Sequence, residues 1–311
     1  MIKRTVYFGN PAYVSLRLDQ LEIRLPEVEK SDALPEGFKT SAVKRIPIED
    51  IGVVVLDHRQ ITISQGALSA LLDHQAAVII CNERRMPSGL LLPLSGNTTQ
   101  SERFSRQIEA SQPLRKQLWQ QTVQAKIRNQ AAVLRALAGL DCGNMDAWVK
   151  QVKSGDTENL EGRAAVFYWQ HLFGHIEGFR RDREGVPPNN LLNYGYAILR
   201  AVVARSLVVS GLLPTLGIHH HNRYNAYCLA DDIMEPYRPY VDRLVAEIVE
   251  TEDDISVLTT AVKSRLLSVP VLDVVVQGRR SPLMIGVGTT TASLYKCYSG
   301  ELRRIAYPEM E

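Results

Sequence analysis

Imidazole and carboxylate side chains gather in one stretch of this sequence, residues 216–239 (LGIHHHNRYNAYCLADDIMEPYRP). Three consecutive histidines at 219–221 follow a glycine, and an acidic segment with Asp231, Asp232 and Glu235 comes next. Imidazole nitrogens and carboxylate oxygens are ligands for divalent metals such as Mn²⁺ and Mg²⁺. These residue types therefore point to metal-dependent chemistry.

The spacing of the acids predicts that they share one side of a helix. Glu235 lies four residues after Asp231 and three after Asp232, so either pair faces the same way and repels unless a cation compensates. A metal could compensate, and so could Arg238 or Arg243. Acids at a helix start are also favoured by the helix dipole alone. In an extended segment neighbouring histidines point to opposite sides, so we do not expect all three to be ligands.

Glu161 is a further candidate outside this stretch. It lies in LEGRAAVFYW, flanked by a leucine, a glycine and two alanines, which indicates close packing around a charged group. Burying a carboxylate without a partner is costly. Either Glu161 is exposed or a positive group meets it, and spacing alone does not identify that group.

Composition limits the classes of protein that fit. The chain has 311 residues, 45% hydrophobic and 23% charged, which is ordinary for a globular protein of about two domains. Its net charge of +2 gives no bulk signal for nucleic-acid binding, so any basic surface must be local. The four cysteines form no C-x-x-C pair, which argues against a zinc ribbon or a disulfide framework.

Targeting signals are not expected. The N-terminal MIKRTVYFGN has no apolar run typical of a signal peptide. We expect no transmembrane helix and no membrane partner, because no stretch of about 18 apolar residues is present. The scattered cysteines suit a reducing compartment, so a cytoplasmic location is expected.

The elements at the N-terminal end are expected to be mostly strands. Alternating apolar residues at 14–18 and 21–25 predict a hairpin with its turn at Asp19 and Gln20. Apolar runs predict buried strands at 51–56 and 76–81, with helical spacing at 66–74 between them. A loop is expected at 30–42. Residues 1–95 are therefore predicted to form a β-sandwich-like domain.

Helical patterns follow the composition break at 95–99. Residues 114–138 are the longest helix predicted, and a strand is expected only at 270–277. Residues 96–311 are thus predicted to be a larger all-α catalytic domain, and the fold class to be α+β. The basic residues of helix 114–138 indicate a solvated face, or alternatively a phosphate-contacting one; they are Arg115, Lys116, Lys126, Arg128 and Arg135. We favour the solvated face. Other helices are predicted at 105–110, 159–175, 193–209, 240–249, 255–267 and 290–298.

Several motifs in this region resemble those of the CRISPR-associated integrase family, above all its type II branch. They are EGRAA around Glu161, LNYGYAILR, LGIHH, LADDIMEPYRP and the C-terminal TTTASLYKCYSGE. Their order and spacing match over most of residues 100–300. The family has an N-terminal β domain and a helical C-terminal domain, as expected above.

The resemblance implies a divalent-metal site, with Mg²⁺ or Mn²⁺ held by Glu161, His220 and Glu235. His220 is the histidine of the L-G-I-x-H motif, which makes His219 and His221 its neighbours only. Asp231 and Asp232 are second choices for the third ligand, because an earlier aspartate takes that place in other branches. The same three residues would be catalytic.

The activity implied is spacer acquisition in antiviral defence. An endonuclease and integrase of this kind joins the 3′-hydroxyl ends of a prespacer to the borders of a CRISPR repeat by transesterification. The implied partners are double-stranded DNA, a second copy of the chain, and a small companion Cas subunit. Two dimers of this chain and one dimer of the companion would form a hetero-hexamer, with residues 1–95 as the dimerisation and scaffold domain.

Two other functions are compatible with these residues. The chain could be a stand-alone metal-dependent nuclease acting on branched DNA, or a non-catalytic DNA-binding subunit whose carboxylates are only ion-paired. Candidate DNA contacts are the arginines next to the motifs, namely Arg163, Arg200, Arg205, Arg223 and Arg238.

Overall fold

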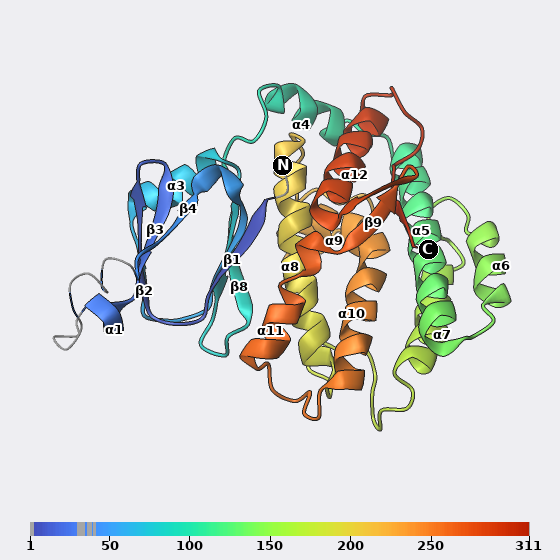
Figure 1. Ribbon diagram of the computed structural model, residues 1–311. Coiled ribbons are helices and arrows are strands. Elements are labelled where there is room, and N and C mark those ends of the chain that lie inside the picture. The colour runs from blue at the N-terminus through green and yellow to red at the C-terminus, as the bar shows by residue number, and fades with distance from the viewer. Residues whose placement is uncertain (1–2, 30–34, 36–38, 40–41, 311) are drawn as a thin grey trace. The chain divides into compact units, whose positions relative to one another are not determined.

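The computed structural model describes residues 3–29, 35, 39 and 42–310 (Figure 1). The chain divides into two compact units, Met1–Gly96 and Asn97–Glu311. This division lies next to the boundary expected at 95/96. Most of the loop predicted at 30–42 lies outside the described residues.

The first sheet of the N-terminal unit is built on two apolar strands. The run IGVVVL is buried at all but its last residue, as expected for a strand covered on both faces. β1 and β7 pair with β5 in parallel, and β8 pairs with β7 antiparallel. The strands predicted at 51–56 and 76–81 are confirmed. The bounds are β1 (Arg4–Phe8), β5 (Ile51–Leu56), β7 (Ala77–Cys81) and β8 (Pro87–Leu91).

The second sheet contains the predicted hairpin, with Leu16 opposite Leu21. Its turn is one residue earlier than predicted, at Leu18 and Asp19, which have φ values of 48° and 55°. Two residues with positive φ give the twist that a two-residue hairpin needs, and Leu18 is therefore exposed instead of lying in the strand. The strand order is β4-β3-β2-β6. The bounds are β2 (Ala12–Arg17), β3 (Gln20–Arg24), β4 (Lys44–Pro47) and β6 (Ile61–Ile63).

Helix α3 (Gln65–Asp73) is part of the crossover between the parallel strands β5 and β7. Parallel strands need a crossover, and α3 lies between β6 and β7 in the chain. Ser64 caps it, because its hydroxyl accepts a hydrogen bond from the Ala67 N–H at 3.2 Å. Leu71 of α3 joins Leu21 and Val78 in the fully buried core of this unit. This unit also contains α1 (Pro26–Glu29) and the 3₁₀ turn η1 (Ile48–Asp50).

The C-terminal unit is mainly helical. Its longest helix, α5, begins after the Ser111 cap and ends at Gly139, whose φ of 59° is the left-handed conformation that glycine adopts freely. The helices predicted at 114–138 and 193–209 are confirmed, as α5 and α8. The bounds are α4 (Gln100–Ile108), α5 (Gln112–Ala138), α6 (Gly143–Gln151), α7 (Leu160–Leu172), α8 (Asn189–Val209), α9 (Cys228–Met234), η2 (Glu235–Tyr237), α10 (Arg238–Thr251), α11 (Thr260–Leu266), η3 (Val269–Val271) and α12 (Leu283–Tyr298).

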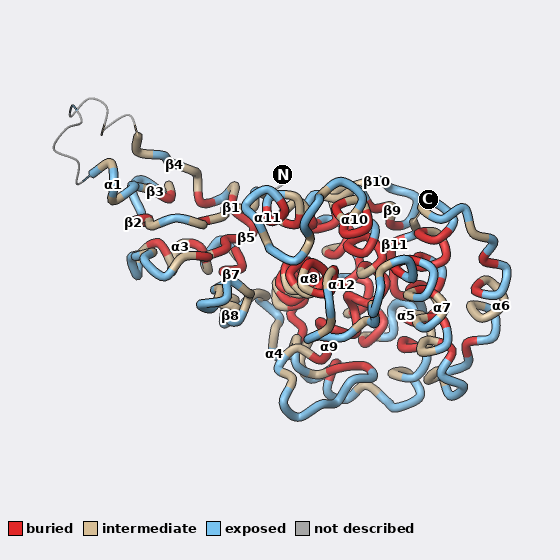
Figure 2. Tube along the Cα trace, turned by 90° about the horizontal axis from the view of Figure 1, so that it is seen from below, coloured by how far each residue is buried: buried red, intermediate tan, exposed pale blue. Residues whose placement is uncertain are grey.

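Helix α8 runs through the core of this unit, and Figure 2 shows it as mostly buried. Its length and composition would allow it to cross a membrane, the only such helix among the described residues. However, 67% of the apolar window is buried inside the protein, as in a core helix.

The all-α prediction for this unit is wrong in one respect. Three short strands form a sheet in the order β10-β9-β11. The strand predicted at 270–277 contains β9 (Asp273–Val276), which turns tightly into β10 (Arg279–Pro282), while β11 (Pro308–Glu309) returns from the C-terminal tail. Overall, the α+β class is confirmed.

Asn129 on α5 ties this sheet to the helices. Its side chain is fully buried. Nδ2 donates to the carbonyls of Pro236 at 2.8 Å and Pro308 at 3.0 Å, and Oδ1 accepts from the Met310 N–H at 3.1 Å. One amide therefore satisfies three backbone groups from η2 and the tail.

We expect Asn129→Ala to destabilise the C-terminal unit by about 3 kcal/mol, because it leaves these buried groups without partners. Urea unfolding followed by circular dichroism measures this. Arg128→Ala is the matched control, since Arg128 is exposed on the same helix; its effect should stay within about 0.5 kcal/mol. Equal stabilities of the two variants would contradict the role of Asn129.

Candidate active site

The histidine loop is fixed by Asp232, a fully buried carboxylate on α9. Its Oδ2 accepts the backbone N–H groups of Ile218 at 2.7 Å and His219 at 2.9 Å. Its Oδ1 lies 2.5 Å from Nδ1 of His220. Because Nδ1 faces the carboxylate, Nε2 is the ring nitrogen left to bind another group. The hydrogen bond to Asp232 raises the pKa of His220, although burial opposes this.

Gly217 allows this close approach. A Cβ at this position would lie 2.3 Å from the carbonyl oxygen of His220 and 2.9 Å from Oδ2 of Asp232. Any side chain would therefore push the loop away from the carboxylate. The glycine before the histidines is a packing requirement of the site.

Two glutamates from separate elements meet at one ammonium group. Glu161 lies in the first turn of α7, whose N–H groups at residues 160 and 161 bind the carboxylate of Asp156. Glu235 begins η2. Lys126 of α5 forms an ion pair with Oε1 of Glu161, and its Nζ lies 2.6 Å from Oε2 of Glu235. The sequence required a positive partner for a buried Glu161, and Lys126 is that partner.

Arg238 neutralises the other side of Glu235. Its Nε lies 3.0 Å from Oε1 of Glu235. Burial by itself would raise the pKa of Glu235, but the charges of Arg238 and Lys126 outweigh it and lower this pKa to about 2. His220 adds to the lowering, so its ring lies within electrostatic range of Glu235. Glu235 is therefore an anion in the folded protein.

Lys126 corrects the solvated-face interpretation of α5. Only 10% of its side chain is exposed, unlike that of Arg128. Burial by itself would lower the pKa of Lys126, but Glu235 and Glu161 raise it. The available signal was its position next to Ile127 and three residues after Val123, inside the apolar stripe of the helix.

The second-choice ligands have other partners. Asp231 accepts from Nε of Arg200 at 2.7 Å and from Nδ2 of Asn225 at 2.7 Å. Asp232 holds the histidine loop, as described above. Neither aspartate contacts Lys126 among the ion pairs of the described residues, whereas Glu161 and Glu235 both do.

Histidines 219 and 221 differ in their surroundings. His219 stacks on Trp119 of α5 with ring centroids 4.2 Å apart and planes 4° from parallel. Burial lowers its pKa, as does the neighbouring His220. His221 is exposed. Trp119 was not singled out from the sequence, because nothing local relates it to a loop about a hundred residues later.

The candidate DNA-contacting arginines are not equally accessible. Arg163 and Arg223 are exposed, and Arg223 lies over the ring of Tyr224 at 4.6 Å. Arg200 and Arg205 are half-buried. Arg238 is held by Glu235 and by the ring of Tyr196, 4.6 Å from its guanidinium carbon. Arg238 thus belongs with Glu161, Lys126 and Glu235 to one cluster of ion pairs, called the charge cluster below. Arg163 and Arg223 are exposed instead.

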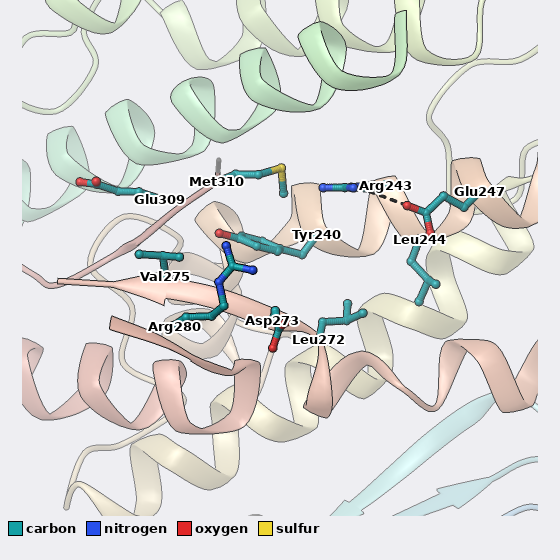
Figure 3. Close-up of a pocket in the computed structure, with 10 residues that line it drawn as sticks. All are labelled: Tyr240, Arg243, Leu244, Glu247, Leu272, Asp273, Val275, Arg280, Glu309 and Met310. Carbon is teal, nitrogen blue, oxygen red and sulfur yellow. Dashed lines mark hydrogen bonds and ion pairs between the residues drawn. The ribbon is translucent and has the colours of Figure 1, made fainter. Parts of the chain in front are cut away.

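One cavity of the C-terminal unit lies apart from this site. A cavity of about 350 Å³ is lined by residues of α10, β9, β10 and the C-terminal tail, and it includes none of the candidate ligands (Figure 3).

Within the described residues, no group of three or more His, Cys, Asp or Glu side chains is arranged to hold a metal. Lys126 Nζ instead lies against both glutamates.

Asp242 is connected to the charge cluster through Tyr196. It is buried on α10 and accepts the hydroxyl of Tyr168 at 3.1 Å and that of Tyr196. Tyr196 in turn lies under Arg238. Burial raises the pKa of Asp242 to about 7, although the tyrosine hydrogen bonds and Arg238 oppose this.

A pH dependence follows from Asp242. Because its folded-state pKa is above its unfolded value, its contribution to stability is complete below about pH 4 and is lost as pH rises through 7, amounting to roughly 4 kcal/mol. Asp242→Asn should remove this part of the slope. Urea unfolding of both proteins between pH 4 and 8 measures it, and identical slopes would contradict the assignment.

The comparisons with known proteins agree with the motifs. A family model described as CRISPR associated protein Cas1 matches residues 12–255. The CRISPR-associated endonuclease Cas1 of Neisseria meningitidis serogroup C is 41% identical over 224 residues, which cover 71% of this chain and 72% of that protein.

Solved structures share the fold. A casposase bound to integration product has a TM-score of 0.79 at 19% identity and covers 100% of this chain and 95% of its own. A chain of a Cas6-RT-Cas1–Cas2 complex has a TM-score of 0.71 at 19% identity; the match covers 99% of this chain and 36% of that longer one. At these identities the likeness concerns the fold.

Proposed function

This chain belongs to the family of CRISPR-associated Cas1 proteins, and we propose that it is a metal-dependent integrase and endonuclease of CRISPR adaptation. It joins prespacer 3′-hydroxyl ends to the borders of a CRISPR repeat. The observation that carries this proposal is the meeting of Glu161 and Glu235 on one cationic group, beside an imidazole whose Nε2 faces away from Asp232.

The donor groups fit a divalent ion that prefers oxygen ligands. Two carboxylates and one imidazole suit Mg²⁺ or Mn²⁺ better than zinc. The buried Oε2 of Glu235 already lies 2.6 Å from a cation, Lys126 Nζ, so this oxygen faces a place where positive charge is accommodated. Glu161, His220 and Glu235 would hold the ion. When bound, it supplies polarisation of the scissile phosphate and eases ionisation of the attacking hydroxyl.

The residues around this site divide the remaining work. Asp232 holds His220 in the tautomer whose Nε2 is free. Arg238 keeps Glu235 ionised, so its carboxylate can act as a ligand at neutral pH. Trp119 holds the loop through His219. Transesterification exchanges one phosphodiester bond for another, so no nucleotide cofactor is required, and holding the two DNA segments in line contributes several kcal/mol.

The reaction also determines the assembly we propose. A repeat has two borders, so two active sites must act, which requires at least a homodimer. The N-terminal unit serves as the dimerisation and scaffold domain, and a small companion Cas subunit bridges two dimers into a hetero-hexamer. A Cas1-like chain in a complex that contains Cas2 is consistent with such a companion. Double-stranded DNA, the prespacer and the repeat, is the substrate.

Strand joining should depend on the three proposed ligands. Glu161→Gln, His220→Ala and Glu235→Gln are expected to lower joining by at least about a thousandfold, because each removes a contact to the ion that stabilises the transition state. The assay uses purified protein, the companion subunit, a prespacer and a supercoiled repeat plasmid with Mn²⁺. His221→Ala is the matched control, since His221 is exposed beside His220.

The same assay separates the alternatives. Undiminished joining by these variants would contradict the site. Cleavage of branched DNA without any joined product would indicate a stand-alone nuclease. Activity of neither kind, with DNA binding that ignores EDTA and falls steeply with salt, would indicate a non-catalytic DNA-binding subunit.

Asp232 should determine metal affinity without being a ligand. Asp232→Asn removes the charge that holds the His220 tautomer and is expected to weaken Mn²⁺ binding by roughly 10- to 100-fold. Titration of the DNA-bound protein with Mn²⁺, followed by electron paramagnetic resonance, measures this. Asp231→Asn is the control that also tests the second-choice ligand: a loss of binding as large as that of Glu235→Gln would move the third ligand to Asp231.

A further inference from the structure

The charge cluster at the proposed metal site is already neutral. Glu161 and Glu235 carry two negative charges, and Lys126 and Arg238 carry two positive ones. Side-chain exposure is 10% for Lys126 and 8% for Glu235, so solvent screens this pair poorly. Both oxygens of Glu235 are in ion pairs, one with each cation.

A divalent ion held by both glutamates must therefore take the place of Lys126 Nζ. The long flexible stem of lysine lets the ammonium move, whereas Arg238 is also held by the ring of Tyr196. In the free protein a displaced ammonium would remain largely buried without an anion, which is strongly unfavourable. The cluster would also go from a net charge of zero to +2.

DNA provides the missing negative charge. A phosphodiester at the site brings one negative charge, and the transition state of the transfer spreads further charge over its oxygens. That phosphate is an anionic partner for the displaced ammonium. The cost of displacing Lys126 is therefore much lower when DNA is present.

We propose that Lys126 makes metal binding and DNA binding mutually dependent. Lys126 occupies the carboxylate pair in the free protein, keeps the two glutamates together, and releases them to the metal when a phosphate arrives. This inference rests on the proposed metal site. Its consequence is that the protein binds metal tightly only with DNA in place, which restricts the nuclease chemistry to assembled complexes.

Thermodynamic linkage requires the effect of DNA on Mn²⁺ affinity to equal the effect of Mn²⁺ on DNA affinity. If DNA tightens Mn²⁺ binding by some factor, Mn²⁺ must tighten DNA binding by the same factor. We expect at least about a tenfold coupling in the wild-type protein, within the range usual for coupled sites. Lys126→Met keeps the stem but removes the charge. It should bind Mn²⁺ at least about tenfold more tightly than wild type without DNA, and its coupling should fall towards one.

The experiment measures Mn²⁺ affinity by electron paramagnetic resonance for the full-length protein, with and without a short duplex that has single-stranded 3′ ends. Arg128→Met is the matched control, because this exposed residue is two positions away on α5; it should behave as wild type. Glu161→Gln with the same duplex gives the background of Mn²⁺ bound to DNA itself. Circular dichroism checks that Lys126→Met is folded.

A second measurement needs no variant. The affinity of the wild-type protein for the duplex is measured by fluorescence anisotropy with Mn²⁺ and with EDTA, and should differ by the same factor as the Mn²⁺ affinities. Equal Mn²⁺ affinity with and without DNA would overturn the proposal while leaving the metal site intact. Unchanged affinity and coupling in folded Lys126→Met would also overturn it. Mn²⁺ binding no greater than the Glu161→Gln background in every state would contradict the proposed function itself.

Discussion

The arrangement of the helical unit depends on a balanced set of charges, of which Lys126 and Glu235 are buried and Glu161 and Arg238 half-buried. Glu161 and Glu235 come from α7 and η2, and two anions brought this close in a poorly solvated place would repel strongly. Lys126 and Arg238 make their approach possible. Removing one member of such a set leaves an uncompensated buried charge, which typically costs about 3–5 kcal/mol. The ion pairs thus determine which packing of these elements is acceptable.

Helix α5 is the element that relates the parts of the site. Trp119 stacks on His219, and Lys126 forms ion pairs with the two glutamates. Asn129 hydrogen-bonds the backbone of η2 and of the tail. These residues follow one another along a single helix, which has a fixed rise per residue. Their spacing on α5 therefore fixes the distances between the histidine loop, the carboxylates and the C-terminal strand.

The cluster of histidines and acids near residue 220 consists of groups with different tasks. Asp232 orients His220, and Asp231 is bound to Arg200 and Asn225. Glu235 alone among the acids of this stretch meets Lys126 in the described part of the chain. Behind them, Tyr196 connects Arg238 to Asp242, so the ion pairs continue into a buried hydrogen-bonded network. The sequence showed that these histidines and acids lie close together in the chain, but it did not show the role of each.

The sequence by itself determined the α+β class, the strands at 51–56 and 76–81, the helices at 114–138 and 193–209, and the family. These follow from local periodicity and from motifs, which are properties of neighbouring residues. It did not reveal that Leu18 is in a turn, that β11 completes a sheet, or that Lys126 is buried. The turn at Leu18 depends on the positive φ values of two neighbouring residues, which the apolar alternation does not encode. The other two were decided by the tertiary structure, because each depends on contacts between residues far apart in the chain. The cation between Glu161 and Glu235 comes from a third helix, and no local pattern encodes which helices meet.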